Sequence, residues 1–138
     1  MWKGDLRSYL KRSGVNYIDK LVYTVYENWD DFKSKNDGDF YYFTRYGHKP
    51  HTSFDYSDVE RNIYLVFGKE STGIPKSILQ KDLEHCMRLP MTDNVRSLNL
   101  SNTVAIATYE VLRQQNYHGL LFEEPHKGAD YLESEEIF

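Results

Sequence analysis

The sequence predicts an α/β domain built on a mainly parallel sheet. Apolar and aromatic runs that are typical of strands alternate along the chain with amphipathic stretches that are typical of helices. Residues 63–67 form a continuous apolar run, as expected of a strand covered on both faces. The chain has 138 residues, 40% of them hydrophobic, which suits one domain with a packed core and excludes a disordered segment.

Strand-like segments are rich in β-branched and aromatic residues. They are residues 21–26, 40–44, 63–67 and 86–90. Residues 47–57 look like an exposed loop, and Asn36-Asp37-Gly38 looks like a turn.

Helices are predicted between these strands. Residues 5–11 form a short one that ends near Gly14, and residues 29–35 form another, capped by Asn28. A third begins at Pro75 and places Ile78, Leu79 and Leu83 on its buried side. The longest covers residues 101–116 and stops at Gly119. Its apolar face consists of Val104, Ala105, Ala107, Val111 and Leu112.

Charge is unevenly distributed. The net charge is −4, which by itself argues weakly against a nucleic-acid partner. Residues 122–138 hold six acidic residues and one lysine, so the rest of the chain is near neutral and can carry a local basic face. We therefore expect an acidic tail at 122–138 attached to a domain at 1–121.

Several protein classes are excluded by simple features. No stretch approaches the roughly 18 apolar residues of a membrane span, and the N-terminus lacks the apolar core of a signal peptide. The single cysteine, Cys86, forbids an internal disulfide and fits a cytoplasmic protein, and we expect it in a buried strand. His48, His51 and His85 have no further ligands at zinc spacing, so no metal is expected.

A glycine-containing loop, residues 68–75, follows the apolar strand. Its two glycines allow a sharp turn and close approach of a ligand to the main chain. A simple strand-to-helix turn with a helix-starting proline explains the spacing at least as well. The loop is not a phosphate loop, because no Gly-Lys-Ser/Thr follows.

A second polar segment precedes the longest helix. Residues 96–102 place Arg96, Ser97 and Asn99 among leucines. Helix capping by Ser101 or Asn102 is the alternative explanation, but it accounts for only one small polar residue. The pattern therefore favours a ligand site, since ligands of open α/β sheets bind beyond the carboxyl ends of strands.

These two segments carry a family resemblance. Residues 65–75 resemble the second signature motif of the SPOUT superfamily of RNA methyltransferases, and residues 88–91 with 96–105 resemble the third. Residues 10–17 and 109–114 are similar to the tRNA (cytidine/uridine-2′-O-)-methyltransferases that act on the wobble nucleotide. The resemblance runs from about Lys3 to Leu121.

The resemblance implies a fold, a cofactor and partners. The fold would contain a deep trefoil knot in its C-terminal half, threaded by the helix at 101–116, which is a rare exception to the rule against knots. The cofactor would be S-adenosyl-L-methionine, and the protein would be a homodimer that binds tRNA, with Tyr109 near the interface. The cofactor contacts carried over from the family are Phe43, Gly68, Leu89 and Ser97, with Met91 and Leu98 completing an apolar pocket for adenine.

The implied chemistry suits these residue types. A ribose 2′-hydroxyl attacks a sulfonium methyl group in line, and the neutral leaving group requires neither a metal nor a covalent nucleophile. Arg96, Ser97 and Asn99 are the candidates for the catalytic role of orienting the ribose and its phosphate. None of the three is an ordinary general base.

One family feature has no counterpart in this sequence. The family begins with a strand–helix–strand unit that carries the first motif, with an arginine implicated in activating the ribose hydroxyl. We therefore expect an N-terminally truncated domain that methylates poorly or not at all. The alternatives are a non-catalytic RNA-binding or dimerisation module that keeps the knot and cofactor pocket, and a generic nucleotide-binding domain.

We further expect a set of basic and histidine residues to form an RNA-facing surface. A solvated helix face and a mobile loop would explain the same residues equally well. Its members are Lys3, Arg7, Lys11, Arg12, Arg45, His48, Lys49 and His51.

Overall fold

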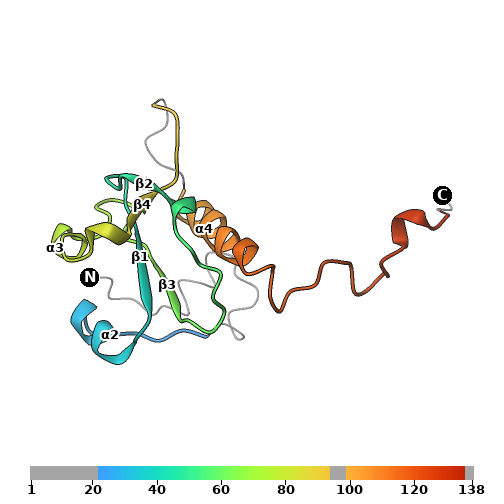
Figure 1. Ribbon diagram of the computed structural model, residues 1–138, viewed down its shortest axis with the longest axis horizontal. Helices are drawn as coiled ribbons and strands as arrows, with labels where there is room; N and C mark the ends of the chain where they lie inside the picture. The colour runs from blue at the N-terminus through green and yellow to red at the C-terminus, as the bar shows by residue number, and fades with distance from the viewer. Residues whose placement is uncertain (1–21, 94–98, 136–138) are drawn as a thin grey trace. The chain divides into compact units, whose positions relative to one another are not determined.

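The computed structural model describes residues 22–93 and 99–135 (Figure 1). The chain divides into two compact units, residues 1–37 and 38–138, and each is described by itself. The helix predicted at 5–11 lies outside the described residues.

The first unit contains helix α2, Trp29–Lys35, as predicted. Asn28 is its N-cap, and its Oδ1 accepts a hydrogen bond from the Asp31 backbone N–H at 2.8 Å. Acidic residues occupy the first turn of α2 and lysines the last, an arrangement that complements the helix dipole.

The strand predicted at 21–26 is wrong over its described part, since residues 22–26 form no strand. Val22 is 93% exposed. Tyr26 instead packs edge-on against Phe32 of α2, with ring centroids 5.1 Å apart. Composition alone suggested a strand, but a strand also needs a partner and a face to bury.

The second unit is built on a parallel sheet, which confirms the mainly parallel α/β class. Its strands are β1 (Asp39–Phe43), β2 (Lys49–Pro50), β3 (Ile63–Val66) and β4 (Cys86–Arg88). Their order is β2-β4-β1-β3, and every described pairing is parallel. β1 has a neighbour on each side and buries its three central residues, Phe40, Tyr41 and Tyr42.

The strand at 63–67 was expected to be covered on both faces, and this is wrong for β3. All four of its residues are half-buried. β3 lies at one edge of the described sheet, where it has a single neighbour, β1. A continuous apolar run therefore marks a strand here without full burial.

The exposed loop predicted at 47–57 is also wrong in part. It contains β2 and a short 3-10 helix, η2 (His51–Ser53), and it delivers Tyr56 into the core at 1% exposure. The Tyr56 hydroxyl donates to the His51 carbonyl at 2.6 Å, so its polar end is satisfied. Tyr56 forms the buried cluster with Tyr41 and Met87.

The helix that begins after Pro75 is short. α3 covers Lys76–Leu79 and buries Leu79 as expected. The chain then leaves helical geometry at Asp82 and enters the 3-10 helix η3, Leu83–His85, which leads into β4. Leu83 is consequently 66% exposed, so its predicted burial is wrong.

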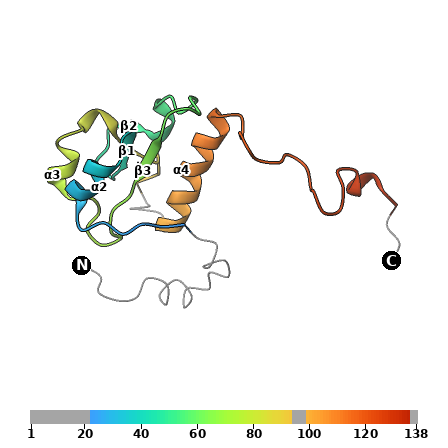
Figure 2. The same cartoon turned by 90° about the horizontal axis from the view of Figure 1, so that it is seen from below.

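Helix α4, Leu100–Gln114, is the longest described helix and lies beside the sheet (Figure 2). Ala107 is buried and Val111 packs against the core cluster, whereas Ala105 is exposed, contrary to expectation. The helix ends before the predicted Gly119, because Asn116 and Tyr117 already adopt left-handed backbone conformations.

Hydrogen bonds join the end of α4 to residues 54–56, which we call the glutamine clamp. Gln114 Nε2 donates to the Phe54 carbonyl at 3.0 Å, and Gln114 Oε1 accepts from the Tyr56 N–H at 2.7 Å. Gln115 Nε2 donates to the Tyr56 carbonyl at 2.9 Å. The Gln114 side-chain amide thus both donates to and accepts from the main chain of residues 54–56, as the main chain of a neighbouring strand would.

The segment after α4 contains the 3-10 helix η4, Tyr131–Glu133. Among the described residues, no helix is long and apolar enough to cross a membrane.

Candidate functional site

A cavity of about 510 Å³ lies where β1, β3 and β4 end and α4 begins. Its wall comes from the turn after β1, the loop after β3, the chain after β4 and the first turn of α4. This is the position at which open α/β sheets bind ligands.

The structure brings five predicted site residues to this one cavity. They are Phe43, Gly68, Leu89, Met91 and Asn99. Arg96, Ser97 and Leu98 lie outside the described residues. Tyr109 is not part of the cavity wall; it lies further along α4 and is 61% exposed.

The loop after β3 closes on itself. The Gly73 N–H donates to the Lys69 carbonyl at 2.8 Å, and Gly73 has a left-handed φ of 71°. A Cβ at Gly68 would lie 2.1 Å from the Gly73 carbonyl carbon, so only glycine fits there. This tight closure leaves residues 70–72 exposed along the cavity wall.

One side of the cavity is apolar. The Phe43 and Phe67 rings, at the ends of neighbouring strands, stack with centroids 4.8 Å apart. Leu89 is buried, and Met91 is half-buried beyond it. Such a surface suits a planar heterocycle. Phe67 was not among the predicted site residues, although its position at a strand end was a usable signal.

The turn after β1 is held rigidly. The Thr44 N–H donates to the Met87 carbonyl at 2.9 Å, and Thr44 Oγ1 accepts from the Tyr46 N–H at 3.2 Å. A Cβ at Gly47 would lie 2.6 Å from the Met87 carbonyl carbon, so the turn sits directly on β4. Arg45 and Tyr46 reach the cavity from this turn.

Asn99 has a structural role that the sequence had assigned to its neighbours. It is the N-cap of α4, and its Oδ1 accepts from the Ser101 N–H at 2.9 Å. Capping by Ser101 or Asn102, the alternative considered from the sequence, is therefore wrong. Because Asn99 also lines the cavity, its predicted catalytic role stays a prediction alongside this capping role.

Cys86 is a core residue, as expected. Burial raises the pKa of its thiol, which donates to the Leu79 carbonyl at 3.7 Å. Within residues 22–93 and 99–135, no three histidine, cysteine or acidic side chains are grouped to hold a metal ion.

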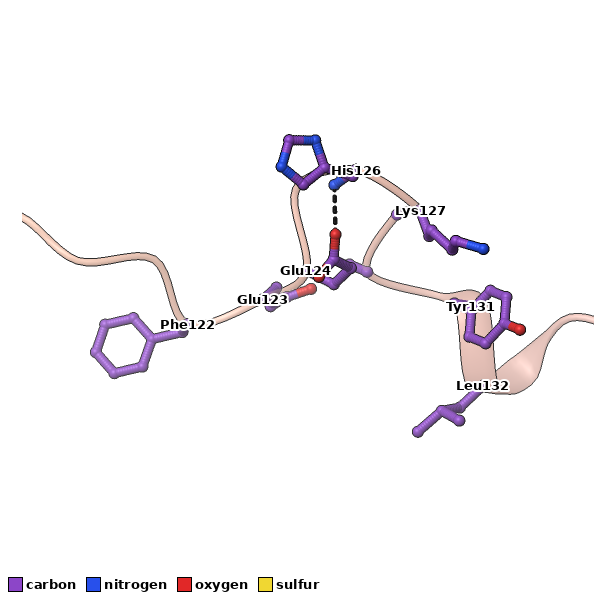
Figure 3. Close-up of a pocket in the computed structure, with 9 residues that line it drawn as sticks. Phe122, Glu123, Glu124, His126, Lys127, Tyr131 and Leu132 are labelled. Carbon is purple, nitrogen blue, oxygen red and sulfur yellow. Dashed lines mark hydrogen bonds between the residues drawn. The ribbon is translucent and has the colours of Figure 1, made fainter. Parts of the chain in front are cut away.

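A second hollow is found in the C-terminal segment (Figure 3). Its residues all come from one stretch, 122–132, and they include a hydrogen bond of 2.7 Å from the His126 N–H to the Glu124 carboxylate. Leu132 is 91% exposed. With no second segment among its wall residues, this hollow is not a preformed site.

Comparison with known proteins gives a consistent assignment. The model of the SpoU rRNA methylase family matches residues 4–109. A Listeria monocytogenes protein that bears the name tRNA (cytidine(34)-2′-O)-methyltransferase is 51% identical over 117 residues, which cover 84% of this chain and 69% of that protein.

By their descriptions, solved structures that resemble this chain also concern RNA methylation. A Bacillus anthracis protein described as an RNA methyltransferase is 49% identical with a TM-score of 0.80, covering 89% of this chain and 77% of that chain. A structure that concerns 2′-OH methylation of C/U34 on tRNA is 28% identical with a TM-score of 0.69, covering 79% and 70%. An AdoMet-bound rRNA methyltransferase from Sinorhizobium meliloti is 25% identical with a TM-score of 0.55, covering 68% and 34%.

The matched region includes every described wall residue of the cavity, from Phe43 to Thr103. The chain belongs to the SpoU rRNA methylase family.

Proposed function

We propose that this chain transfers a methyl group from S-adenosyl-L-methionine to the ribose 2′-oxygen of the wobble nucleotide, position 34, of a tRNA. The observation that carries the proposal is that one cavity, at the ends of parallel strands and the start of α4, gathers Phe43, Gly68, Leu89, Met91 and Asn99. The names of the relatives support the reaction and the substrate.

The residues of the cavity suit the cofactor. The stacked rings of Phe43 and Phe67, with Leu89 and Met91, offer an apolar surface for an adenine ring. Because Gly68 carries no side chain, the Gly73 main chain packs directly against it and closes the loop that forms this part of the cavity wall. When bound, the cofactor supplies an electrophilic methyl group on a sulfonium. The AdoMet-bound relative supports this choice of cofactor.

The chain itself has to align the ribose and relieve its hydroxyl of a proton. A bond forms between the 2′-oxygen and the methyl carbon as the carbon–sulfur bond breaks, and the hydroxyl proton is released. Asn99, fixed at the start of α4 by its cap, can hold the ribose by hydrogen bonds, together with Arg96 and Ser97. No metal takes part in this scheme.

The homodimer belongs to the same proposal. Ala105, Ile106 and Tyr109 form an exposed apolar face on α4, and Ile106 is 43% exposed. An apolar face on a helix beside a site supports an interface that completes the site. The deep knot, an acidic tail at 122–138 behind a domain at 1–121, and a cytoplasmic location, where a tRNA substrate is found, are proposed with it.

The test is methyl transfer to defined tRNA transcripts with C or U at position 34. We expect a 2′-O-methylated nucleoside at that position, detected by mass spectrometry of the digested RNA, in low yield because the sequence has no counterpart of the family's first motif. A transcript with 2′-deoxyribose at position 34 serves as the matched control and should accept no methyl group. Methylation of that control would contradict the proposal. Binding of S-adenosylhomocysteine without any transfer would favour the non-catalytic module.

A further inference from the structure

Three cationic side chains reach the cavity from three different segments. Arg45 lies on the turn after β1, Lys69 on the loop after β3, and Arg88 is the last residue of β4. Arg45 and Lys69 are exposed and Arg88 is half-buried. Only Arg45 had been considered for RNA contact from the sequence, and there it was grouped with other residues.

These three cations have no carboxylate partner, in contrast to Lys49 and Arg113 of the same unit. Lys49 Nζ lies 3.1 Å from a Glu84 carboxylate oxygen, and Arg113 Nε lies 2.8 Å from one of Glu110. In the described part of the chain, neither Arg45, Lys69 nor Arg88 forms an ion pair. Glu70 is the single acidic residue on the described cavity wall, and it pairs with none of them.

The backbone beneath all three cations is fixed. The turn that carries Arg45 rests on β4, and the loop that carries Lys69 is closed by the Gly73 hydrogen bond. Arg88 Nη1 donates to the Arg45 carbonyl at 3.4 Å, which links β4 to the turn. A site on rigid elements loses little entropy when a ligand binds, so these cations are prepared for an anion.

The anion can be identified from the chemistry of the substrate. Each ribose 2′-oxygen adjoins the phosphodiester attached to the 3′-oxygen of the same sugar. A cavity that receives the 2′-hydroxyl therefore also receives that phosphate near its mouth. Arginine guanidinium groups match two phosphate oxygens at once. The carboxylate of the cofactor is the competing anion, and the experiment below separates the two.

We propose that Arg45, Lys69 and Arg88 bind the phosphodiester on the 3′ side of the nucleotide that is methylated. This inference rests on the proposed function. It adds the residues that hold the RNA backbone at a fixed distance from the cavity. The contact positions the ribose and carries no base specificity, which fits a site that accepts either pyrimidine.

The experiment is a double-mutant cycle on RNA binding by the full chain. The ligand is an anticodon stem–loop with 2′-deoxyribose at position 34, made with either a normal phosphate or a neutral methylphosphonate on its 3′ side. Loss of one phosphate contact to single-stranded RNA lowers the slope of log K against log salt concentration by about 0.7. At 0.1 M salt, relative to 1 M salt, this change corresponds to a Kd that is roughly fivefold weaker. We expect Arg45→Ala and Lys69→Ala each to weaken the normal RNA by about this factor.

The methylphosphonate should weaken binding to the unsubstituted chain by a similar factor and have little further effect on either variant. Lys81→Ala is the matched control, because Lys81 is an exposed lysine outside the cavity wall. It should keep the full response to the methylphosphonate. Equal responses in all four proteins would overturn the proposal.

S-adenosylhomocysteine titration supplies the second readout. Its Kd should be unchanged in Arg45→Ala and Lys69→Ala, and a weaker Kd would assign the cations to the cofactor carboxylate and overturn the proposal. We call the loss of the methylphosphonate response in Arg45→Ala and Lys69→Ala the phosphate coupling. If this coupling is observed but no methyl transfer occurs, the proposed function alone is contradicted. Methyl transfer without the coupling would contradict this inference alone.

Discussion

Gly68 and Gly73 lie in the same loop but are required for different reasons. At Gly68 there is no space, since a Cβ would overlap the Gly73 main chain. At Gly73 there is space, with nothing within 4 Å of a Cβ, but the φ of 71° is unfavourable for any other residue. The first glycine is set by packing and the second by backbone conformation.

Alanine substitutions should separate these two requirements. Gly73→Ala should lower the free energy of unfolding by about 1–2 kcal/mol, the cost of one left-handed residue, and keep cofactor binding. Gly68→Ala must displace the loop, so it should cost more stability and also weaken S-adenosylhomocysteine binding at least tenfold. Urea unfolding and calorimetric titration measure both effects. Equal, mild effects of the two substitutions would show that the loop is not closed as described.

At the scale of elements, the glutamine clamp positions α4. In the described chain it supplies the side-chain hydrogen bonds that join α4 to residues 54–56, while the opposite end of the helix, with Asn99, completes the cavity. Glu110 Oε2 accepts a further bond from Gln114 Nε2 at 3.0 Å. Hydrogen bonding from Arg113 lowers the pKa of the Glu110 carboxyl, so this acceptor stays ionised and holds the Gln114 amide in place.

Removing the clamp should loosen the helix. Gln114→Ala leaves the Phe54 carbonyl and Tyr56 N–H without these partners, and we expect a loss of about 1–3 kcal/mol in the free energy of unfolding. Gln115→Ala removes one bond from a half-buried side chain and should cost less, about 1 kcal/mol. Thermal unfolding of both variants checks the order. A larger loss in Gln115→Ala would contradict the role given to Gln114.

The sequence was sufficient for features that depend on neighbours along the chain. Asn28 and α2, the central strand β1 and the helix α4 all follow from local composition and spacing. Phe43, Gly68 and Leu89 reach one cavity because each follows or ends a parallel strand, and such strand ends meet at one edge of a sheet.

Features that depend on distant contacts were beyond the sequence. Tyr56 is buried because residues 54–56 are bound by Gln114 of a later helix. Arg45 is positioned because Gly47 fits against Met87 of β4. Leu83 is exposed because α3 ends early. The positions of Tyr56 and Arg45 depend on tertiary contacts, and the exposure of Leu83 depends on where α3 ends, and hydrophobic periodicity records neither.

At the scale of the whole molecule, the proposed homodimer can be tested through the exposed face of α4. Ile106→Glu would bury an unpaired charge in each half of that interface, at a cost of about 3 kcal/mol or more, or over a hundredfold in the dimer dissociation constant. Leu83→Glu is the matched control, because Leu83 is an exposed leucine away from α4. Sedimentation equilibrium should show a monomer for Ile106→Glu alone. A dimer that withstands Ile106→Glu would place the interface elsewhere.

The strand order β2-β4-β1-β3 has a consequence for how the chain acquires its shape during synthesis. β4 is the last described strand to leave the ribosome, yet it takes a place between β2 and β1. The described strands cannot form a hairpin early, since all their pairings are parallel and parallel neighbours need long connections, and such topologies fold slowly. β1 can pair with β3 first, while β2 waits for β4. The cavity therefore takes shape only after β4 has been inserted and α4 has emerged, so the nascent chain lacks this cavity while β1 and β3 are already able to pair.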